Sequence, residues 1–193
     1  MLHNKYFEIL EKFLGDYNRE IYGRELIGNV NLSQKSIALV LNELRNKGIL
    51  RSKKRGNMKY FGLNLDNSEM KDIIVSTEIT KKLDFLKKYR KLANLFKRDN
   101  RVVGIFGSYA KGIQKRDSDV DIFIVGNKIK NDYDLVGEKF NFDISIKYFS
   151  ESEFRKLIKE KNNLIKEVVL NHILLFGVEK FVNVLWGDYY GFD

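Results

Sequence analysis

The amino-acid sequence predicts a mixed α+β and α/β chain organised as two modules joined by a helical segment. In the first 66 residues, apolar positions recur at helical spacing and then alternate as in paired strands. After residue 100, apolar runs of strand length are separated by a glycine-containing turn and by acidic residues. We therefore expect a first module over residues 1–66, a helical linker over 67–99, and a small mixed sheet with C-terminal helices over 100–193.

The first module is predicted to contain three helices. Residues 6–13 carry apolar side chains at positions i, i+3, i+4 and i+7, and Gly15 then ends this amphipathic helix. A short second helix is expected over 24–28, and Asn31 can cap a third helix that ends at Gly48. The apolar face of the third helix would consist of Ile37, Val40, Leu41 and Leu44.

A strand, a tight turn and a second strand follow the third helix. Residues 49–55 and 58–61 flank Gly56 and Asn57, which together are typical of a hairpin turn. Three helices followed by a hairpin resemble a winged helix-turn-helix domain, over roughly residues 3 to 64. The resemblance implies that the third helix enters a nucleic-acid groove and that the hairpin, or wing, contacts phosphates. The residues assigned in this way are Ser33, Gln34 and Lys35 on the helix and Arg51, Lys53, Lys54, Arg55 and Lys59 on the wing.

The net charge of +9 is carried entirely by the part of the chain before residue 101. Residues 1–66 have 12 Lys and Arg against 7 Asp and Glu, residues 67–100 have 9 against 5, and residues 101–193 have 14 of each kind. This asymmetry favours a polyanionic partner, so we expect nucleic acid to bind the first module. The alternative is a protein-docking domain with a solvated basic face, because winged helices also serve as docking modules.

The linker is predicted to form one or two helices. Asp66 and Glu69 can cap its start, and the β-branched run 73–75 favours a break near Ser76. A long helix with a surplus apolar face would also suit a homodimer interface. The apolar stripe of the linker would consist of Ile79, Leu83, Leu86, Leu92 and Phe96.

The second module opens with a buried strand and a glycine turn. Residues 101–106 form the predicted strand, and Gly107 and Ser108 then begin a short helix. Free backbone N–H groups at the start of such a helix suit phosphate, Gly107 allows close approach, and the Ser108 hydroxyl adds a donor. The spacing from Gly107 to Gly112 imitates a P-loop, but Ile and Gln follow Gly112 where that motif requires Lys and then Ser or Thr. A Walker-type ATPase is therefore disfavoured.

Three aspartates are candidates for a metal site. Asp119 and Asp121 begin a strand whose period of two places both carboxylates on one face. Such carboxylates repel each other unless a cation lies between them, and Mg²⁺ takes one or two carboxylates and leaves its other positions to water and phosphates. Asp143 begins another alternating run and would join the site if the two strands are neighbours. Three acids at one end of a sheet suit two Mg²⁺ or Mn²⁺ ions ~3.5–4 Å apart.

Roughly residues 100 to 185 resemble the minimal nucleotidyltransferases in the DNA polymerase β superfamily. The residues that match their signature are Gly107, Ser108, Gly112, Ser118, Asp119, Asp121 and Asp143. The resemblance implies that Asp119 and Asp121 bind both metals and that Asp143 binds the catalytic one. It also implies that Gly107 and Ser108 hold the β- and γ-phosphates of an NTP, with ATP as the expected nucleotide. The other residues assigned to the nucleotide are Ser118 and Lys111, the latter standing where many relatives carry arginine with its bidentate geometry.

Composition restricts the remaining possibilities. The chain has no cysteine, which excludes disulfides and thiolate metal sites. No apolar run approaches the ~18–20 residues of a membrane span and no signal-peptide core is present, so a cytoplasmic protein without membrane contact is expected. Residues 151–186 are predicted to be helices that pack on the sheet, and His172 is expected to be a core residue rather than a catalytic base. The core candidates here are Leu164, Val168, Ile173, Leu174 and Phe176.

The predicted function is metal-dependent transfer of a nucleoside monophosphate from an NTP to an acceptor hydroxyl on RNA, a protein or a small molecule. Two alternatives stay open. One is a DNA-binding transcriptional regulator or antitoxin-like protein whose nucleotidyltransferase fold binds nucleotide without turnover and which has a protein partner. The other is modification of a small molecule such as an aminoglycoside, which leaves the basic module unused.

Overall fold

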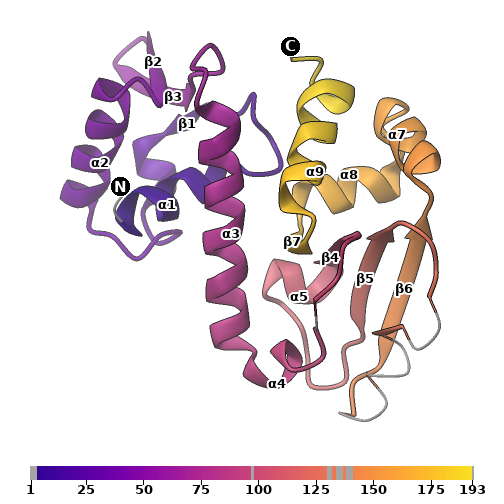
Figure 1. The fold of residues 1–193 in the computed structure, drawn as a ribbon. Coiled ribbons are helices and arrows are strands. Elements are labelled where there is room, and N and C mark those ends of the chain that lie inside the picture. Colours follow the sequence, from indigo (N-terminus) through magenta and orange to yellow (C-terminus); the bar gives the residue numbers. More distant parts are fainter. Residues whose placement is uncertain (1–3, 97, 130–131, 134–136, 138–140, 193) are drawn as a thin grey trace. The chain divides into compact units, whose positions relative to one another are not determined.

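The computed structural model describes residues 4–96, 98–129, 132–133, 137 and 141–192 (Figure 1). The chain divides into two compact units, Met1–Thr77 and Glu78–Asp193. The boundary falls inside α3 (Met70–Lys88), so the segment predicted as a linker contributes to both units.

The first unit combines helical segments with a small antiparallel sheet. The predicted opening helix is α1 (Asn4–Leu10), which continues as a 3-10 turn over Glu11–Phe13. The predicted second helix is a 3-10 turn, Gly23–Leu26, rather than an α-helix. The remaining elements are β1 (Ile21–Tyr22), α2 (Gln34–Asn46), β2 (Leu50–Arg55) and β3 (Met58–Leu63).

Helix α2 buries the face that its periodicity predicts. Ile37, Val40, Leu41 and Leu44 are all buried. The N-terminal cap is Ser33, whose side chain accepts a hydrogen bond from the backbone N–H of Ser36 at 3.3 Å. The expected cap at Asn31 was therefore placed too early.

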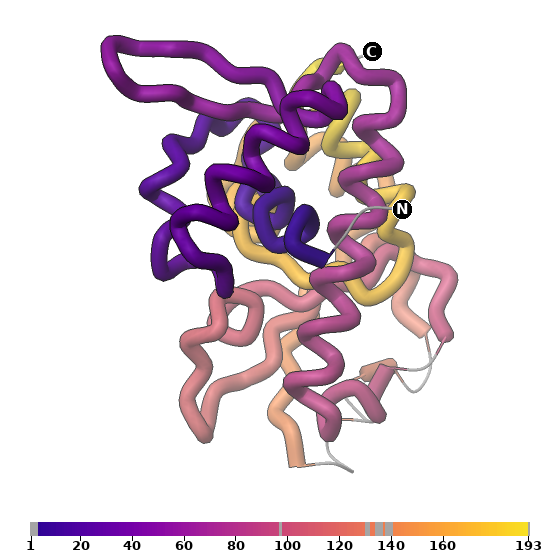
Figure 2. The backbone as a smooth tube through the Cα atoms, turned by 90° about the vertical axis from the view of Figure 1, so that its left-hand side faces the viewer, coloured from indigo at the N-terminus to yellow at the C-terminus, as the bar shows by residue number. Residues whose placement is uncertain are grey.

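The predicted hairpin is confirmed by the pairing of β2 with β3. Its register runs from Leu50 opposite Leu63 to Arg55 opposite Met58, and β1 pairs on the other side of β3. Figure 2 shows the hairpin extending away from the helices of the first unit. It therefore presents both of its faces at its outer end.

Helix α3 passes through Ser76 without the expected break. Burial of the Ile73 and Ile74 side chains stabilises a segment whose β-branched residues have modest helix propensity. The helix ends before Tyr89, and a short helix α4 (Arg90–Ala93) follows. Two members of the predicted apolar stripe, Ile79 and Leu83, are 39% and 49% exposed. Across the described residues, no helix has both the length and the apolarity to cross a bilayer.

The second unit contains a four-stranded mixed sheet in the order β6-β5-β4-β7. Strand β5 is parallel to β6 and antiparallel to β4, and β7 is antiparallel to β4. The residues of β7 were predicted to be helical. A run of four apolar residues has no periodicity that distinguishes a strand from a helix. The four strands are β4 (Val102–Phe106), β5 (Val120–Val125), β6 (Ile144–Phe149) and β7 (Ile173–Phe176).

Both faces of this sheet are covered. On one face, Ile105 and Ile122 join a core that includes Phe85 and Leu92 from the helical segment. On the other face, the Phe123 ring packs on aromatic rings of the C-terminal helices, and Gly104 makes room for it because a Cβ at position 104 would overlap that ring. The C-terminal helices are α7 (Glu151–Lys159), α8 (Asn163–Leu170) and α9 (Val178–Val184), the last followed by a π-helical turn over Leu185–Tyr189.

Two polar clusters lie inside the second unit. His172 and Glu78 are each 1% exposed, and Nε2 of the histidine lies 2.8 Å from Oε1 of the glutamate. This confirms His172 as a core residue. The guanidinium of Arg101 pairs with Asp99 at 2.7 Å and with Asp132 at 2.8 Å, which ties the start of β4 to the segment after β5.

Candidate active site

The glycine turn and the second motif aspartate lie together at one end of the sheet. Phe106, the last residue of β4, is paired with Asp121 of β5. Gly107 then adopts a φ of +68° and begins α5 (Gly107–Lys111), which ends at Gly112 with a φ of +70°. A Cβ at position 107 would overlap Oδ2 of Asp121. The carboxylate of Asp121 is thus held directly against the backbone of Gly107.

The strands that carry the motif aspartates are neighbours, as expected. In the parallel pair β5–β6, Val120 is opposite Ile144 and Asp121 is opposite Ser145. Asp143 lies immediately before β6, and its carbonyl oxygen accepts a hydrogen bond from the backbone N–H of Val120 at 2.8 Å. Alternation along the strands places the side-chain positions 119, 121 and 143 on one face of the sheet. Asp119 and Asp143 are exposed, whereas Asp121 is half-buried.

The carboxyl group of Asp121 is in an environment that disfavours its charge. Partial burial raises its pKa, and the negative charges of Asp119 and Glu167 raise it further. Lys147 acts in the opposite direction, but the net shift is upward. An ionised pair at positions 119 and 121 therefore has unfavourable electrostatics that a bound cation would relieve.

Two charged residues near this site were missed in the sequence. Glu167, on α8, and Lys147, on β6, both influence the charge state of Asp121. Alternation along β6 is the one signal for Lys147, because it puts this residue on the same face as position 145. Nothing in the sequence spacing indicates Glu167, which only the packing of α8 brings near the sheet.

The residues assigned to the nucleotide have local roles in the structure. The Lys111 ammonium group forms an ion pair with Glu167 at 2.6 Å. The Ser118 hydroxyl oxygen accepts a hydrogen bond from the backbone N–H of Lys115 at 2.8 Å and so shapes the loop before β5. The Ser108 side chain is half-buried at the start of α5. Their contact with a nucleotide stays a prediction.

Two carboxylates at this end of the sheet could hold a divalent cation. Asp119 and Asp121 supply hard oxygen donors, and the negative charge around Asp121 outweighs the positive charge of Lys147. Both properties suit Mg²⁺. Among the side chains that the structure describes, no group of three or more Asp, Glu or His is arranged to hold a metal ion. The participation of Asp143 as a third ligand therefore stays a prediction.

The basic residues predicted for the wing are divided between the two faces of the hairpin. Residues 51 to 55 are all exposed. Because side chains alternate, Arg51, Lys53 and Arg55 lie on one face, whereas Lys54 lies on the other face beside its cross-strand partner Lys59. Arg55 forms an ion pair with Glu20 and lies over the Tyr60 ring, so it is less available to a phosphate than the others.

Lys59 is the least solvated of the predicted wing cations. Its Nζ donates a hydrogen bond to Asn42 Oδ1 at 3.0 Å and lies 4.9 Å from the centre of the Phe61 ring. Burial lowers its pKa, and the neighbouring charges of Arg45 and Lys54 lower it further. The positive charge around Lys59 therefore comes from α2 as well as from the hairpin.

The start of α2 presents part of the predicted recognition surface. Gln34 and Lys35 are exposed at the first turn of the helix. Ser33 is also exposed, but its hydroxyl is used as the helix cap and lies 3.0 Å from the Ser36 hydroxyl. The Ser33 hydroxyl thus serves the helix itself, and binding of the exposed Gln34 and Lys35 to nucleic acid stays a prediction.

Comparison with known proteins identifies the region that carries the aspartates. Comparisons with curated proteins and with solved structures found no match. Residues 90–180 match the family model described as Polymerase beta, Nucleotidyltransferase. The matched segment lies within the second unit and includes the glycine turn, all three motif aspartates and the strands β4 to β7. The match supports a domain of the nucleotidyltransferase superfamily in this part of the chain.

Proposed function

We propose that the second unit transfers a nucleoside monophosphate from an NTP, with ATP as the expected donor, to an acceptor hydroxyl group. The observation that carries this proposal is the position of the Asp121 carboxylate against the Gly107 backbone. This arrangement supports the proposal because a glycine turn lies beside an acid in a region that matches a nucleotidyltransferase family. In the forward reaction, the acceptor hydroxyl loses its proton to water and its oxygen forms a bond to the α-phosphorus, while pyrophosphate leaves with the electrons of the broken P–O bond.

Asp119, Asp121 and Asp143 would hold Mg²⁺ in this proposal. When bound, the cation supplies charge neutralisation for the triphosphate and lowers the pKa of the attacking hydroxyl. The upward shift of the Asp121 pKa supports the assignment, because the carboxylate pair lacks a compensating positive charge of sufficient strength. The aspartates hold their own carboxylates at one end of the sheet and would thereby orient the reactants there.

Gly107, Ser108, Lys111 and Ser118 would position the triphosphate. Gly107 contributes a backbone without a side chain, and Ser108 contributes a hydroxyl donor. Lys111 is engaged by Glu167 at 2.6 Å, so phosphate binding requires the ammonium group to exchange or share that carboxylate. The ion pair thereby tunes the affinity of Lys111 for phosphate.

The first unit would act as a winged-helix module that binds nucleic acid. Its support is the exposed basic hairpin together with the exposed residues Gln34 and Lys35 at the start of α2. A module of this kind would bring the transfer reaction to an acceptor or to a site on DNA.

The second candidate is a regulator that binds nucleotide without turnover. The Lys111–Glu167 ion pair favours it, because a cation that remains paired with a carboxylate gives less help to a developing phosphate charge. In this case the nucleotide would control binding by the first unit.

One experiment separates the two candidates. The protein is incubated with each NTP labelled at the α-phosphate, with Mg²⁺ and cell extract, and pyrophosphate release and labelled products are measured. The transferase predicts Mg²⁺-dependent pyrophosphate and label in RNA, protein or a small molecule, all lost in Asp121→Asn. Nucleotide binding by calorimetry without any pyrophosphate release would instead establish the regulator.

A further inference from the structure

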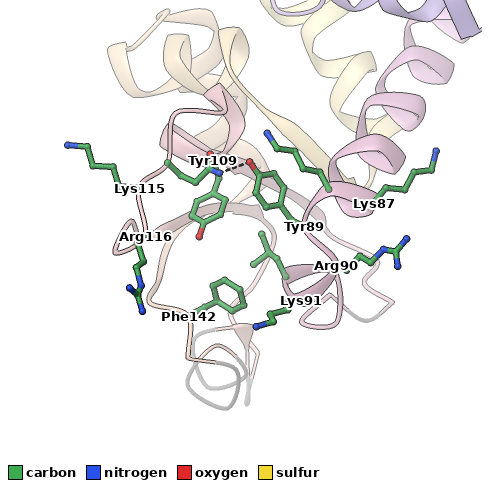
Figure 3. Close-up of a pocket in the computed structure, with 11 residues that line it drawn as sticks. Lys87, Tyr89, Arg90, Lys91, Tyr109, Lys115, Arg116 and Phe142 are labelled. Atoms are coloured by element: carbon green, nitrogen blue, oxygen red, sulfur yellow. Dashed lines mark hydrogen bonds between the residues drawn. The ribbon is translucent and has the colours of Figure 1, made fainter. Parts of the chain in front are cut away.

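The second unit has a pocket of about 660 Å³ that the proposed transfer reaction does not use. It lies between the end of α3, α4, the loop after α5 and the residue before Asp143 (Figure 3). Phe142 in its wall packs against the core that contains Ile122, whereas alternation puts Asp121 on the opposite face of the sheet. The pocket is thus separated by the sheet from the predicted metal site.

The inner wall of the pocket is aromatic. Figure 3 shows the rings of Tyr89, Tyr109 and Phe142 grouped around its middle. The Tyr89 and Tyr109 rings meet edge to face with their centres 5.6 Å apart. Gln114 Nε2 donates a hydrogen bond to the Tyr89 hydroxyl at 2.6 Å, and the ring itself packs against the rings of Phe85 and Tyr109. Tyr109 itself is a buried core ring, so the partly exposed rings of Tyr89 and Phe142 are the surfaces that the pocket offers.

The rim of the pocket is cationic. Its charged lining residues are all positive, and they are Lys87, Lys88, Arg90, Lys91, Lys115 and Arg116. Figure 3 shows Lys115 and Arg116 extending outward on one side, and Lys87 and Arg90 on the other. Lys87 pairs with Asp84 at 3.1 Å, and within the described part of the chain the other five form no ion pair. These charges are available to an anionic ligand.

We propose that this pocket binds single-stranded nucleic acid. Unpaired bases would stack on the aromatic rings, and the phosphates between them would contact the cations on the rim. A volume of about 660 Å³ is within the usual range of ligand pockets, ~300–1,000 Å³. Duplex nucleic acid fits less well, because its bases are already stacked and cannot reach the rings. The inference depends on the second unit alone and does not require the proposed transfer reaction.

The first test removes charge from the rim in the full-length chain. Binding of a fluorescein-labelled single-stranded RNA of about 12 nucleotides is followed by anisotropy over a range of salt concentrations. Lys91→Gln/Lys115→Gln should lower the slope of log affinity against log salt by about 1.4, since each lost phosphate contact removes ~0.7. The matched control is Lys156→Gln/Lys180→Gln, which removes two exposed cations elsewhere in the same unit and should leave the slope unchanged.

The second test removes a ring. Tyr89→Leu should weaken binding of the single strand by roughly 5- to 150-fold, the range expected for loss of one stacked base. Tyr89→Phe keeps the ring and should bind within about twofold of the unmodified chain, because stacking does not need the hydroxyl. Thermal unfolding of each variant checks that the second unit is intact. If Tyr89→Leu unfolds, the charge variants above still decide the matter.

A comparison with duplex and protein ligands completes the test. Both pocket variants should bind a duplex of the same sequence as well as the unmodified chain does. Equal losses for single strand and duplex would overturn the proposal, as would a charge variant that behaves like its control. Displacement of the RNA by polyglutamate as effectively as by polyuridylate at equal charge would also overturn it and would assign the pocket to an acidic protein.

Discussion

The backbone of Gly107 supports the carboxylate of Asp121, so the glycine turn and the second motif acid form one structural feature. The antiparallel register sets this up by placing Phe106 opposite Asp121, and the positive φ of Gly107 then turns the chain across that carboxylate. Because a Cβ at position 107 would overlap Oδ2 of Asp121, any other residue there must displace the acid. The glycine is required by the acid as well as by the turn.

Gly107→Val is expected to impair both folding and nucleotide binding. The positive φ and the displaced carboxylate should together lower the free energy of unfolding by roughly 2–4 kcal/mol. Triphosphate affinity in the folded fraction should fall by at least about tenfold, since the close approach at the turn is blocked. Denaturant unfolding and calorimetric titration with a non-hydrolysable NTP measure the two effects.

Gly112→Ala is the control for backbone strain. Gly112 also has a positive φ, at +70°, but a Cβ there has no heavy atom within 4 Å. This variant should lose only about 1 kcal/mol of stability and keep its nucleotide affinity. A Gly107→Val protein with unchanged affinity in its folded fraction would contradict the nucleotide role of the turn.

Asp121→Asn should separate function from stability. Removing one metal-binding charge should reduce transfer by at least about 100-fold, and Asp119→Asn should do the same. The Asp121 pKa is higher in the folded chain than in the unfolded chain. Ionisation of this carboxyl therefore lowers the free energy of unfolding as the pH rises above the pKa of the unfolded chain. The neutral variant should therefore be at least as stable as the unmodified chain at neutral pH. Pyrophosphate release and thermal unfolding test this pair of outcomes, and normal turnover would exclude the mechanism.

The Asp99 carboxylate should contribute stability that disappears in acid. Partial burial acts to raise its pKa, but hydrogen bonds from Arg101 and Tyr133 outweigh this and lower it to about 2. A depressed pKa stabilises the fold above the unfolded value of about 3.9, and the contribution is lost as the pH falls from there towards 2. Asp99→Asn should cost about 1–2 kcal/mol at neutral pH, and the difference should shrink below about pH 4.

Urea unfolding at several pH values measures the Asp99 contribution. Asp84→Asn is the matched control, because the interaction of Asp84 with the described residues is an exposed i,i+3 ion pair with Lys87. The control should show little change at any pH. A stability difference for Asp99→Asn that stays constant down to about pH 2 would contradict the assigned linkage.

Glu78 should stabilise the second unit through its buried contact with His172. The histidine Nδ1 faces the carbonyl oxygens of Val168 and Val169, so it donates there and leaves Nε2 to the glutamate. Glu78→Ala removes that partner inside the core and should lower the free energy of unfolding by roughly 3–5 kcal/mol. Glu78→Gln keeps the volume, and its side-chain amide can still hydrogen-bond Nε2 of His172, so its loss should be smaller. Denaturant unfolding that ranked the two variants in the opposite order would contradict this account.

The wing prediction is tested by its dependence on salt. Arg51→Gln/Lys53→Gln/Lys54→Gln should weaken duplex binding and lower its salt slope by roughly two to three units, because each phosphate contact contributes ~0.9. Arg55→Gln alone should have a smaller effect, since Arg55 already pairs with Glu20. Filter binding or anisotropy at several salt concentrations gives the slopes. An unchanged slope in the triple variant would mean that the hairpin is solvated or binds protein.

The sequence was sufficient for features that depend on short-range periodicity. The buried face of α2, the hairpin around Gly56 and the strands β4 and β5 all follow from apolar spacing over a few residues. The same local pattern identified Gly107 and the motif aspartates, because turn chemistry and strand alternation are set by neighbouring residues.

Where packing outweighs propensity, the sequence was a poorer guide. Burial of its side chains keeps α3 helical beyond Ser76 despite the β-branched run. Pairing with β4 makes residues 173–176 a strand, although they lie in a segment predicted to be helical. In both cases the deciding interactions join residues far apart in the chain, which single-sequence patterns do not record.

The final charge arrangement of the site was decided by tertiary structure alone. Asp119 and Asp121 are placed on one face by the strand itself, and this follows from the sequence. The approach of Glu167 to Lys111, however, depends on how α8 packs against the sheet, and the contact of Gly107 with Asp121 depends on the register of β4 with β5. Short-range patterns therefore indicated which residues form the candidate site, whereas long-range packing determined the electrostatic environment in which they are held.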